Sequence, residues 1–328
     1  MTSSGWNHKS RMYATPLVVV LGPTAAGKSA LAVALAEAHG GEVVSADAMA
    51  VYRRMDLGTA KPTAAERRGV PHHCIDCLEP QDGCDASRWL ALAETAIAGI
   101  RARDRLPIIA GGSPLYVKVL LEGLSAGVPR DDAVRARLHR EYAELGGAAL
   151  FARLQQVDPG YAAQRHANDE RRLVRALEVF ELTGQPYSSF HVTDGVRRSD
   201  VRTLLIGLRW EQEALHRRIN ARAKAMFAAG LIDEVAALRD RLGKEARQAV
   251  GYKEVLAHLE GAYDAAFALY QVQKASRQLA KQQRTWFRRF RDIRWLDGDR
   301  PDLVAAAAAL VAEFLGEPAR ATPPVAGG

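Results

Sequence analysis

A glycine-rich loop near the amino terminus constrains the fold of this chain more than any other feature of its sequence. It follows a short, β-branched apolar run at residues 17–21 and precedes residues 30–38, which are rich in strong helix formers. The loop consists of Gly22, Pro23, Thr24, Ala25, Ala26, Gly27, Lys28 and Ser29. Its glycines permit tight turns, so that successive backbone N–H groups point inward and form an anion cradle. The motif and its context predict a site that grips a pyrophosphate group.

Two side chains of this loop predict how the phosphate oxygens are held. Lys28 supplies a point charge, and the N-terminus of the following helix adds the positive end of its dipole. The Ser29 hydroxyl is a candidate ligand for Mg²⁺, which we therefore expect as the cofactor. The loop by itself does not name a reaction, because kinases and NTPases use the same cradle for nucleotides.

The pattern around the loop is typical of an α/β protein. Short strands are predicted at residues 42–45, 73–77, 106–110 and 201–208, and a helix is predicted behind the candidate cap Asp85. Strands that alternate with helices indicate a parallel sheet covered on both faces, similar to that of P-loop NTPases.

Helical periodicity replaces this alternation between residues 131 and 183, which indicates an all-helical insertion. Helices are predicted to dominate again from residue 211 to residue 294. The expected organisation is a disordered N-terminus (1–15), a first part of the P-loop core (16–129), the helical insertion domain (130–198), a second, helical and basic part of the core (199–316), and a disordered tail (317–328).

Composition narrows the class of protein. With 328 residues, 48% hydrophobic and 25% charged, the chain is expected to be a globular protein with a sizeable core. No apolar run is long enough for a signal peptide or a membrane span, so we expect no membrane association and a cytoplasmic location. A net charge of +7 favours an anionic partner. The three cysteines, an odd number, argue against a disulfide framework.

Asp47 stands at the end of the second predicted strand. In P-loop enzymes an acid on a neighbouring strand takes part in catalysis by organising Mg²⁺. From position alone, a turn or capping aspartate is an equally good interpretation, so the role of Asp47 stays open at this point.

Several segments resemble the tRNA dimethylallyltransferases in their order and spacing. Besides the loop, they are residues 45–52, 55–62, 111–116, 166–178, 250–254 and 277–287, and the resemblance extends over residues 17–296. It implies a fold similar to P-loop kinases but a different reaction. A dimethylallyl group passes from dimethylallyl diphosphate to the exocyclic amine of an adenine beside the anticodon of tRNA, and the loop holds the diphosphate as the leaving group.

The resemblance also implies roles for individual residues. Asp47 is expected to act as general base on the amine, while Arg222 and Lys28 contact the diphosphate together with Thr24. One departure from the family pattern is Ala48, which replaces a common serine. A monomer is implied. The implied tRNA contacts are Asp47, Ala48, Met49, Ala50, Ser113, Arg135, Arg171, Arg172, Leu173, Val174, Arg175, Gln248, Ala249, Val250, Gly251, Tyr252 and Lys253.

A basic stretch near the carboxyl terminus favours a nucleic-acid partner. Residues 274–294 contain eight Lys or Arg side chains and a single acid, Asp292, with Trp286, Phe287 and Phe290 between them. Lysine and arginine contacts to phosphates provide salt-dependent affinity for RNA. The aromatic side chains are interpreted mainly as core, because they recur on one side of an amphipathic helix.

Three other functions remain open on the sequence. A P-loop kinase of small molecules needs only the loop, and it predicts phosphate transfer from ATP without RNA. A non-catalytic P-loop protein that binds RNA needs the basic helix but not Asp47. An adenylate isopentenyltransferase, which prenylates the free nucleotide, uses the same chemistry on a smaller acceptor.

Overall fold

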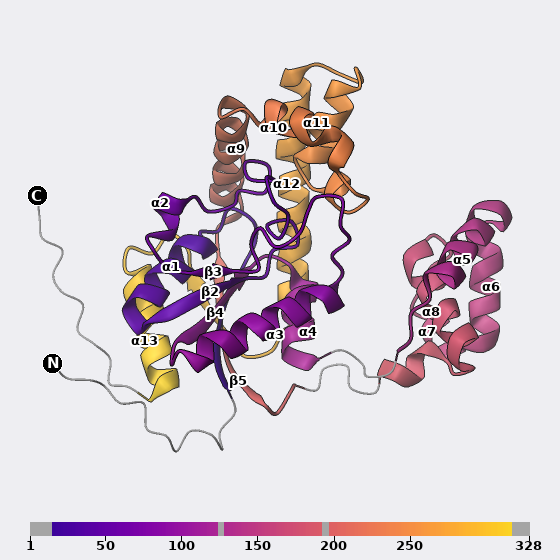
Figure 1. Cartoon of the computed structure of the whole chain (residues 1–328), viewed down its shortest axis with the longest axis horizontal. Coiled ribbons are helices and arrows are strands. Elements are labelled where there is room, and N and C mark those ends of the chain that lie inside the picture. Colours follow the sequence, from indigo (N-terminus) through magenta and orange to yellow (C-terminus); the bar gives the residue numbers. More distant parts are fainter. Residues whose placement is uncertain (1–14, 124–127, 192–196, 317–328) are drawn as a thin grey trace, which may run out of the picture. The chain divides into compact units, whose positions relative to one another are not determined.

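The computed structural model describes residues 15–123, 128–191 and 197–316 (Figure 1). The predicted disordered tail at residues 317–328 lies outside the described residues, as does the predicted disordered N-terminus up to residue 14. Thr15 is a correction to that prediction, because its N–H donates to the Asp200 carbonyl and it pairs with Val201 in a strand.

The chain forms two compact units. The core unit comprises Met1–Leu121 and Ser199–Gly328, and the helical unit comprises Glu122–Arg198. The helical unit contains the predicted insertion at residues 130–198, and its boundary falls earlier in the chain, at Glu122.

The core unit contains a six-stranded sheet in which all neighbouring strands are parallel, which confirms the predicted α/β class. The strand order is β3-β2-β4-β1-β5-β6. The strands are β1 (Thr15–Leu21), β2 (Gly41–Ser45), β3 (His72–His73), β4 (Leu106–Gly111), β5 (Val201–Arg209) and β6 (Ile293–Asp297). Strand β6 lies where the sequence analysis expects helix up to residue 294. It has five residues, of which only Leu296 is buried while Arg294 and Asp297 are exposed, so the apolar signal of a strand is short there.

Helices cover both faces of the sheet because the strand residues alternate between two apolar clusters. Val18 and Val20 pack with α1 (Lys28–His39) and α13 (Leu303–Leu315), which contact each other (Figure 1). Val19 belongs to the opposite cluster, with α3 (Ala86–Ala102) and α4 (Pro114–Glu122). The cap predicted for α3 is confirmed, since the Asp85 side chain accepts the N–H of Arg88.

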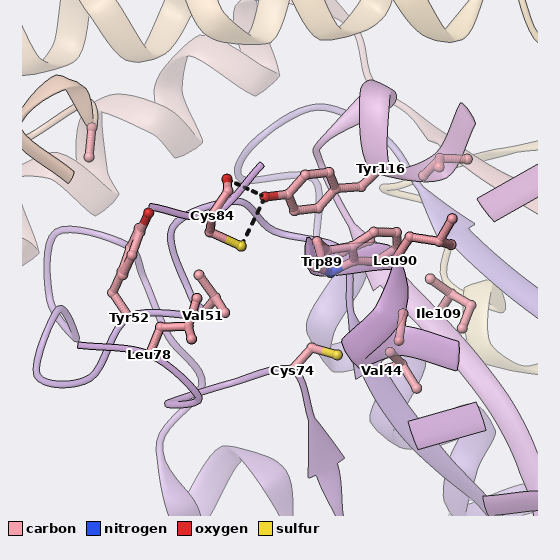
Figure 2. Close-up of a cluster of buried hydrophobic side chains, with 14 of the residues drawn as sticks. Val44, Val51, Tyr52, Cys74, Leu78, Cys84, Trp89, Leu90, Ile109 and Tyr116 are labelled. Atoms are coloured by element: carbon pink, nitrogen blue, oxygen red, sulfur yellow. Dashed lines mark hydrogen bonds between the residues drawn. The ribbon is translucent and has the colours of Figure 1, made fainter. Parts of the chain in front are cut away.

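The cluster under α3 fixes the carboxyl end of β2 (Figure 2). Trp89 stacks on Tyr116 with 4.4 Å between ring centroids, and its indole N–H donates to the Ser45 carbonyl at 2.9 Å. The Tyr116 hydroxyl donates to the carbonyl of Cys84 at 3.4 Å. The cysteines are free thiols, and burial raises the pKa of Cys84 and of Cys74, to about 12 in Cys74. These thiols serve as core residues.

The remaining helices divide between the two units. The core unit adds α2 (Ala64–Arg67), α9 (Gln212–Ala228), α10 (Leu231–Leu238), α11 (Tyr252–Leu259), α12 (Ala265–Phe287) and the short turns η3 (Arg239–Arg241) and η4 (Ala246–Gln248), and α9 packs on α12. The helical unit comprises α5 (Asp132–Leu145), α6 (Gly147–Val157), α7 (Pro159–Ala162), α8 (Glu170–Thr183) and η2 (Tyr187–His191) around an apolar core of its own. In the part of the chain that is described, no helix combines the length and apolar character of a membrane span.

Candidate active site

The carboxyl ends of the parallel strands bring the predicted site residues to one edge of the sheet. The glycine-rich loop follows β1, Asp47 follows β2, and Gly112 follows β4. In open α/β sheets this edge is where ligands bind. The chain after β2 and the end of β4 approach so closely that a Cβ on Gly111 would lie 2.2 Å from the Ala46 carbonyl oxygen. Glycine is therefore required at this position.

Three carbonyl groups of the glycine-rich loop accept hydrogen bonds from side chains, while the N-terminus of α1 stays available to bind an anion. Lys28 Nζ donates to the Pro23 carbonyl at 2.8 Å, Arg218 Nε to Ala25 at 2.8 Å, and Trp210 Nε1 to Ala26 at 3.0 Å. The first N–H groups of α1 have no intrahelical partners and carry the positive end of the helix dipole. These features fit an anion cradle at residues 22–29.

Trp210 and Arg218 are site residues that the sequence analysis missed. Trp210 lies between β5 and α9, Arg218 lies on α9, and the Arg218 guanidinium stacks 4.4 Å from the Trp210 ring centroid. The available signal was spacing: Arg218 and Arg222 are four residues apart, so they share one face of a helix. The Arg222 guanidinium donates to the Thr24 hydroxyl, which brings a second cation to the loop.

The electrostatics of the loop favour an added anion. Burial lowers the pKa of Lys28 to about 8, Asp47 acts in the opposite direction, and Arg222 lowers it further. Burial likewise lowers the pKa of Arg222, against the effect of Asp47. Guanidinium groups keep their charge in proteins, so this region holds closely spaced cations. They border a cavity of about 1350 Å³ that is lined by Lys28, Ser29, Arg218 and Arg222.

Asp47 is anchored through its carboxylate oxygen Oδ1. Its Oδ1 accepts the N–H groups of Met49 at 2.9 Å and Ala50 at 3.3 Å. Within the described residues, Oδ2 has no hydrogen bond, and the side chain lines a second cavity of about 1190 Å³. The carboxylate is therefore held in place and still able to accept a proton, as a general base must be.

The donor set near the loop fits a divalent cation only if a ligand supplies most of its oxygens. Ser29 is exposed at the start of α1, beside the cradle. Among the described residues, no group of three His, Cys, Asp or Glu side chains could hold a metal ion. Mg²⁺ usually keeps water and phosphate oxygens as ligands and takes few from the protein. The chemistry of the site is compatible with Ser29 as a ligand of a metal diphosphate, and that role stays a prediction.

Most predicted tRNA contacts of the core unit lie around the Asp47 cavity. Its walls include Ala48, Met49, Ser113, Gln248, Ala249 and Val250. They also include the basic side chains of α12 and the residues that follow it, Arg277, Lys281, Arg284, Arg288 and Arg289. Lys253 is exposed. Apart from Ala249, which is 4% exposed, these predicted residues are placed where they are accessible to an RNA ligand.

The predicted contacts at Ala50 and Tyr252 need correction. Ala50 is 4% exposed, its N–H donates to Asp47, and its carbonyl accepts the N–H of Asp76. The Tyr252 side chain is fully buried, and burial followed by its bond to Glu234 raises the pKa of its hydroxyl. Both residues belong to the framework of the site, because neither side chain is accessible to RNA.

Glu234 holds that framework together, and the sequence analysis missed it. Its carboxylate accepts the N–H groups of Asp56 at 3.0 Å, Leu57 at 2.7 Å and Gly58 at 3.0 Å. It also accepts the hydroxyl of Tyr252. The predicted motif at residues 55–62 is therefore a structural partner of the segment that begins α11.

The predicted tRNA contacts of the helical unit differ in accessibility. Arg135 and Arg175 each donate to the buried carboxylate of Glu178 at 2.8 Å. Arg171 and Arg172 are both exposed, and Arg172 pairs with Asp169 at 2.6 Å. The contacts at Leu173 and Val174 are corrected by the structure, because these side chains are 0% and 1% exposed in the core of the unit. The motif at residues 166–178 therefore includes residues that pack in the core as well as residues that are accessible to a ligand.

Comparisons with known proteins agree with this geometry. The IPP transferase family model matches residues 50–290. The tRNA dimethylallyltransferase of Anaeromyxobacter dehalogenans is 49% identical over 282 residues, which are 85% of this chain and 92% of the relative. That of Shouchella clausii is 43% identical over 302 residues, which cover 92% and 97% of the two chains.

Solved structures are similar over almost the whole chain. The full-length tRNA isopentenylpyrophosphate transferase from Bacillus halodurans matches with a TM-score of 0.68 and 38% identity, covering 92% of this chain and 97% of the other. A eukaryotic dimethylallyltransferase acting on tRNA matches with a TM-score of 0.81 and 25% identity, covering 94% and 81%. On the family match and these relatives, the chain belongs to the IPP transferase family.

Proposed function

We propose that this protein transfers a dimethylallyl group from dimethylallyl diphosphate to the exocyclic amine of an adenine next to the anticodon of tRNA. The observation that carries the proposal is the pairing of an anion cradle with Asp47, a carboxylate that keeps one oxygen without a hydrogen bond among the described residues. Relatives named tRNA dimethylallyltransferase support the choice of substrates.

The cradle suits a diphosphate leaving group. As the allylic C–O bond breaks, its electron pair stays on the diphosphate, where negative charge grows. Lys28, Arg222 and the N-terminus of α1 stabilise that charge where it develops. Mg²⁺, held by Ser29 and diphosphate oxygens, would supply further neutralisation of this charge when bound.

Asp47 suits the other end of the reaction. The exocyclic nitrogen of adenine is weakly basic and loses a proton as it bonds to the allylic carbon. Oδ2 of Asp47 accepts that proton, while the amides of Met49 and Ala50 hold Oδ1. The adenine must leave its stack in the anticodon loop to reach this carboxylate.

The RNA ligand is proposed to bind over the Asp47 cavity. Lys281 and Arg288 line the cavity and are exposed, and the structure pairs neither with a carboxylate in the chain that it describes. Such side chains contact backbone phosphates and give affinity that falls with salt. Gln248 and Ser113 offer polar groups close to the place where the adenine must lie.

A transfer assay tests the proposal directly. The protein is incubated with Mg²⁺, labelled dimethylallyl diphosphate and, in parallel reactions, tRNA or AMP, and separate reactions contain labelled ATP with AMP or with tRNA. We expect tRNA to become labelled by dimethylallyl diphosphate and not by ATP, and we expect AMP to stay unlabelled. Label in AMP would identify an adenylate isopentenyltransferase, and phosphate transfer from ATP would identify a kinase. The Asp47→Asn variant is the matched control, because it keeps the size of the side chain and removes the base.

A further inference from the structure

A buried glutamine of α12 connects the diphosphate loop to the loop that follows β4. Gln283 is 7% exposed. Its Oε1 accepts the N–H of Thr24 at 2.7 Å, and its Nε2 donates to the carbonyl of Gly112 at 2.7 Å. The residues that it joins are far apart in the sequence, so this contact exists only in the folded core unit.

Further hydrogen bonds connect the two groups bound by the Gln283 amide to the anion cradle and to Asp47. On one side, the Thr24 hydroxyl accepts a hydrogen bond from Arg222 beside the anion cradle. On the other, Ser113, the neighbour of Gly112, donates its N–H to the Ala46 carbonyl at 3.1 Å, directly before Asp47. A continuous path of hydrogen bonds and single peptide units therefore leads from the cradle to the carboxylate.

The contact at Gly112 leaves little space. A Cβ at this position would lie 2.5 Å from Gln283 Nε2, a distance that forces the amide to move, and 3.6 Å from Lys28 Nζ, an ordinary contact. A shift of the amide away from Gly112 would lengthen its hydrogen bonds to the Gly112 carbonyl and the Thr24 N–H, which are both 2.7 Å long. An unsatisfied buried amide is costly, so the two loops are held at one separation.

We propose that Gln283 is a positioning residue that sets the distance between the diphosphate site and Asp47. The inference rests on the proposed transfer reaction, in which the allylic carbon must lie between the leaving oxygen and the attacking nitrogen. Gln283 contacts neither reacting group through the bonds described above. It acts on the rate by fixing the loop at Thr24 and the peptide after β4, and a misplacement near 1 Å costs about 100-fold in rate.

The first experiment separates turnover from binding. Single-turnover rates, kcat and the KM values for dimethylallyl diphosphate and tRNA are measured for the wild type, Gln283→Ala and the control Gln271→Ala, a glutamine of the same helix that lies outside the residues lining the Asp47 cavity. We expect Gln283→Ala to lower the single-turnover rate about 30-fold with KM values within threefold, because positioning acts in the transition state. Gln271→Ala should keep the wild-type rate.

Two outcomes overturn the inference while leaving the proposed function intact. One is an active wild type with Gln283→Ala within twofold of it. The other is a loss confined to the KM for tRNA, which would make Gln283 an RNA-binding residue. A wild type that transfers no label instead refutes the proposed function. If Gln283→Ala does not fold, as judged by its thermal unfolding transition, Gln283→Met replaces it with a side chain of similar volume.

A double-mutant cycle provides the second experiment. Gly112→Ala should lower the rate about tenfold in the wild type, because its Cβ displaces the Gln283 amide. In the Gln283→Ala background the same change should cost less than twofold, since the displaced group is gone. Equal effects in both backgrounds would refute the proposed coupling.

Discussion

Basic side chains of the helical unit and of α12 look alike in the sequence, but the structure uses them differently. In the helical unit, Arg135 and Arg175 converge on Glu178, whose side chain is 0% exposed. On α12 and just after it, Lys281 and Arg288 are exposed and line the Asp47 cavity. One set holds a fold together, and the other presents charge to a ligand.

The difference teaches that the surrounding acids decide what an arginine does. Burial by itself would raise the pKa of Glu178, but hydrogen bonds from Arg175, Arg135 and the Asp131 amide outweigh it and hold that pKa below its ordinary value. The basic stretch at residues 274–294 contains only one acid, Asp292. Its cations are therefore the better predictors of an RNA surface.

The largest effect is expected from removing the general base of the core unit, Asp47. Asp47→Asn should lower the single-turnover rate of transfer about 1000-fold, because a general base contributes roughly 100- to 10,000-fold. Its affinity for tRNA, measured by filter binding, should change less than threefold. Equal losses in rate and affinity would show that Asp47 acts in binding instead.

A second test removes the charge at the centre of the helical unit. Glu178→Gln leaves two arginines without their buried partner and should reduce the free energy of unfolding of this unit by about 3 kcal/mol. Urea denaturation followed by circular dichroism measures the loss. The control is Glu213→Gln, whose side chain is 84% exposed and should change stability little. A Glu178→Gln protein as stable as the wild type would show that Arg135 and Arg175 do not stabilise the fold through this carboxylate.

A third test addresses the cations of α12. The combined change of Lys281, Arg288 and Arg289 to Ala should weaken tRNA binding about 30-fold at low salt and reduce the salt slope by about 2, because fewer counterions are released. Arg172→Ala, which removes a side chain already paired with Asp169, serves as the comparison and should have a smaller effect. An unchanged salt slope in the triple variant would mean that RNA binds elsewhere.

The smallest expected effect concerns the pH dependence of diphosphate binding. The Lys28 ammonium must be protonated to attract an anion, and its pKa is about 8. Affinity for inorganic diphosphate is therefore nearly full at pH 7 and falls as the pH rises through about 8, by about tenfold from pH 7 to pH 9. Lys28→Arg should remove this part of the dependence in calorimetric titrations. A wild type and variant with parallel pH profiles would contradict the assignment.

The sequence predicts the parts of the site that are local and leaves out those that fold back from a distance. The cradle at residues 22–29 and Asp47 follow strands, so a short motif with its context was sufficient to place them. Gln283 and Glu234 contact backbone groups more than 170 positions away in the chain, as their separations of 259 and 176 residues from Thr24 and Gly58 show. No local pattern reports such contacts.

The errors have a physical reason as well. Val174 and Tyr252 were predicted as tRNA contacts because they lie inside motifs, although helix periodicity places every third or fourth residue in the core. Strand β6 was missed because its short, half-exposed run follows a basic helix. Burial, not motif membership, separates ligand contacts from supports.

The carboxylate of Glu234 has a consequence for how this enzyme tolerates change. It binds three consecutive amides of one segment and the Tyr252 hydroxyl of another, so the two stretches behave as one exchangeable module. Transplanting residues 55–62 into a related scaffold without Glu234 would leave those amides unsatisfied. Recombination between distant relatives should therefore succeed only when all three pieces come from the same parent.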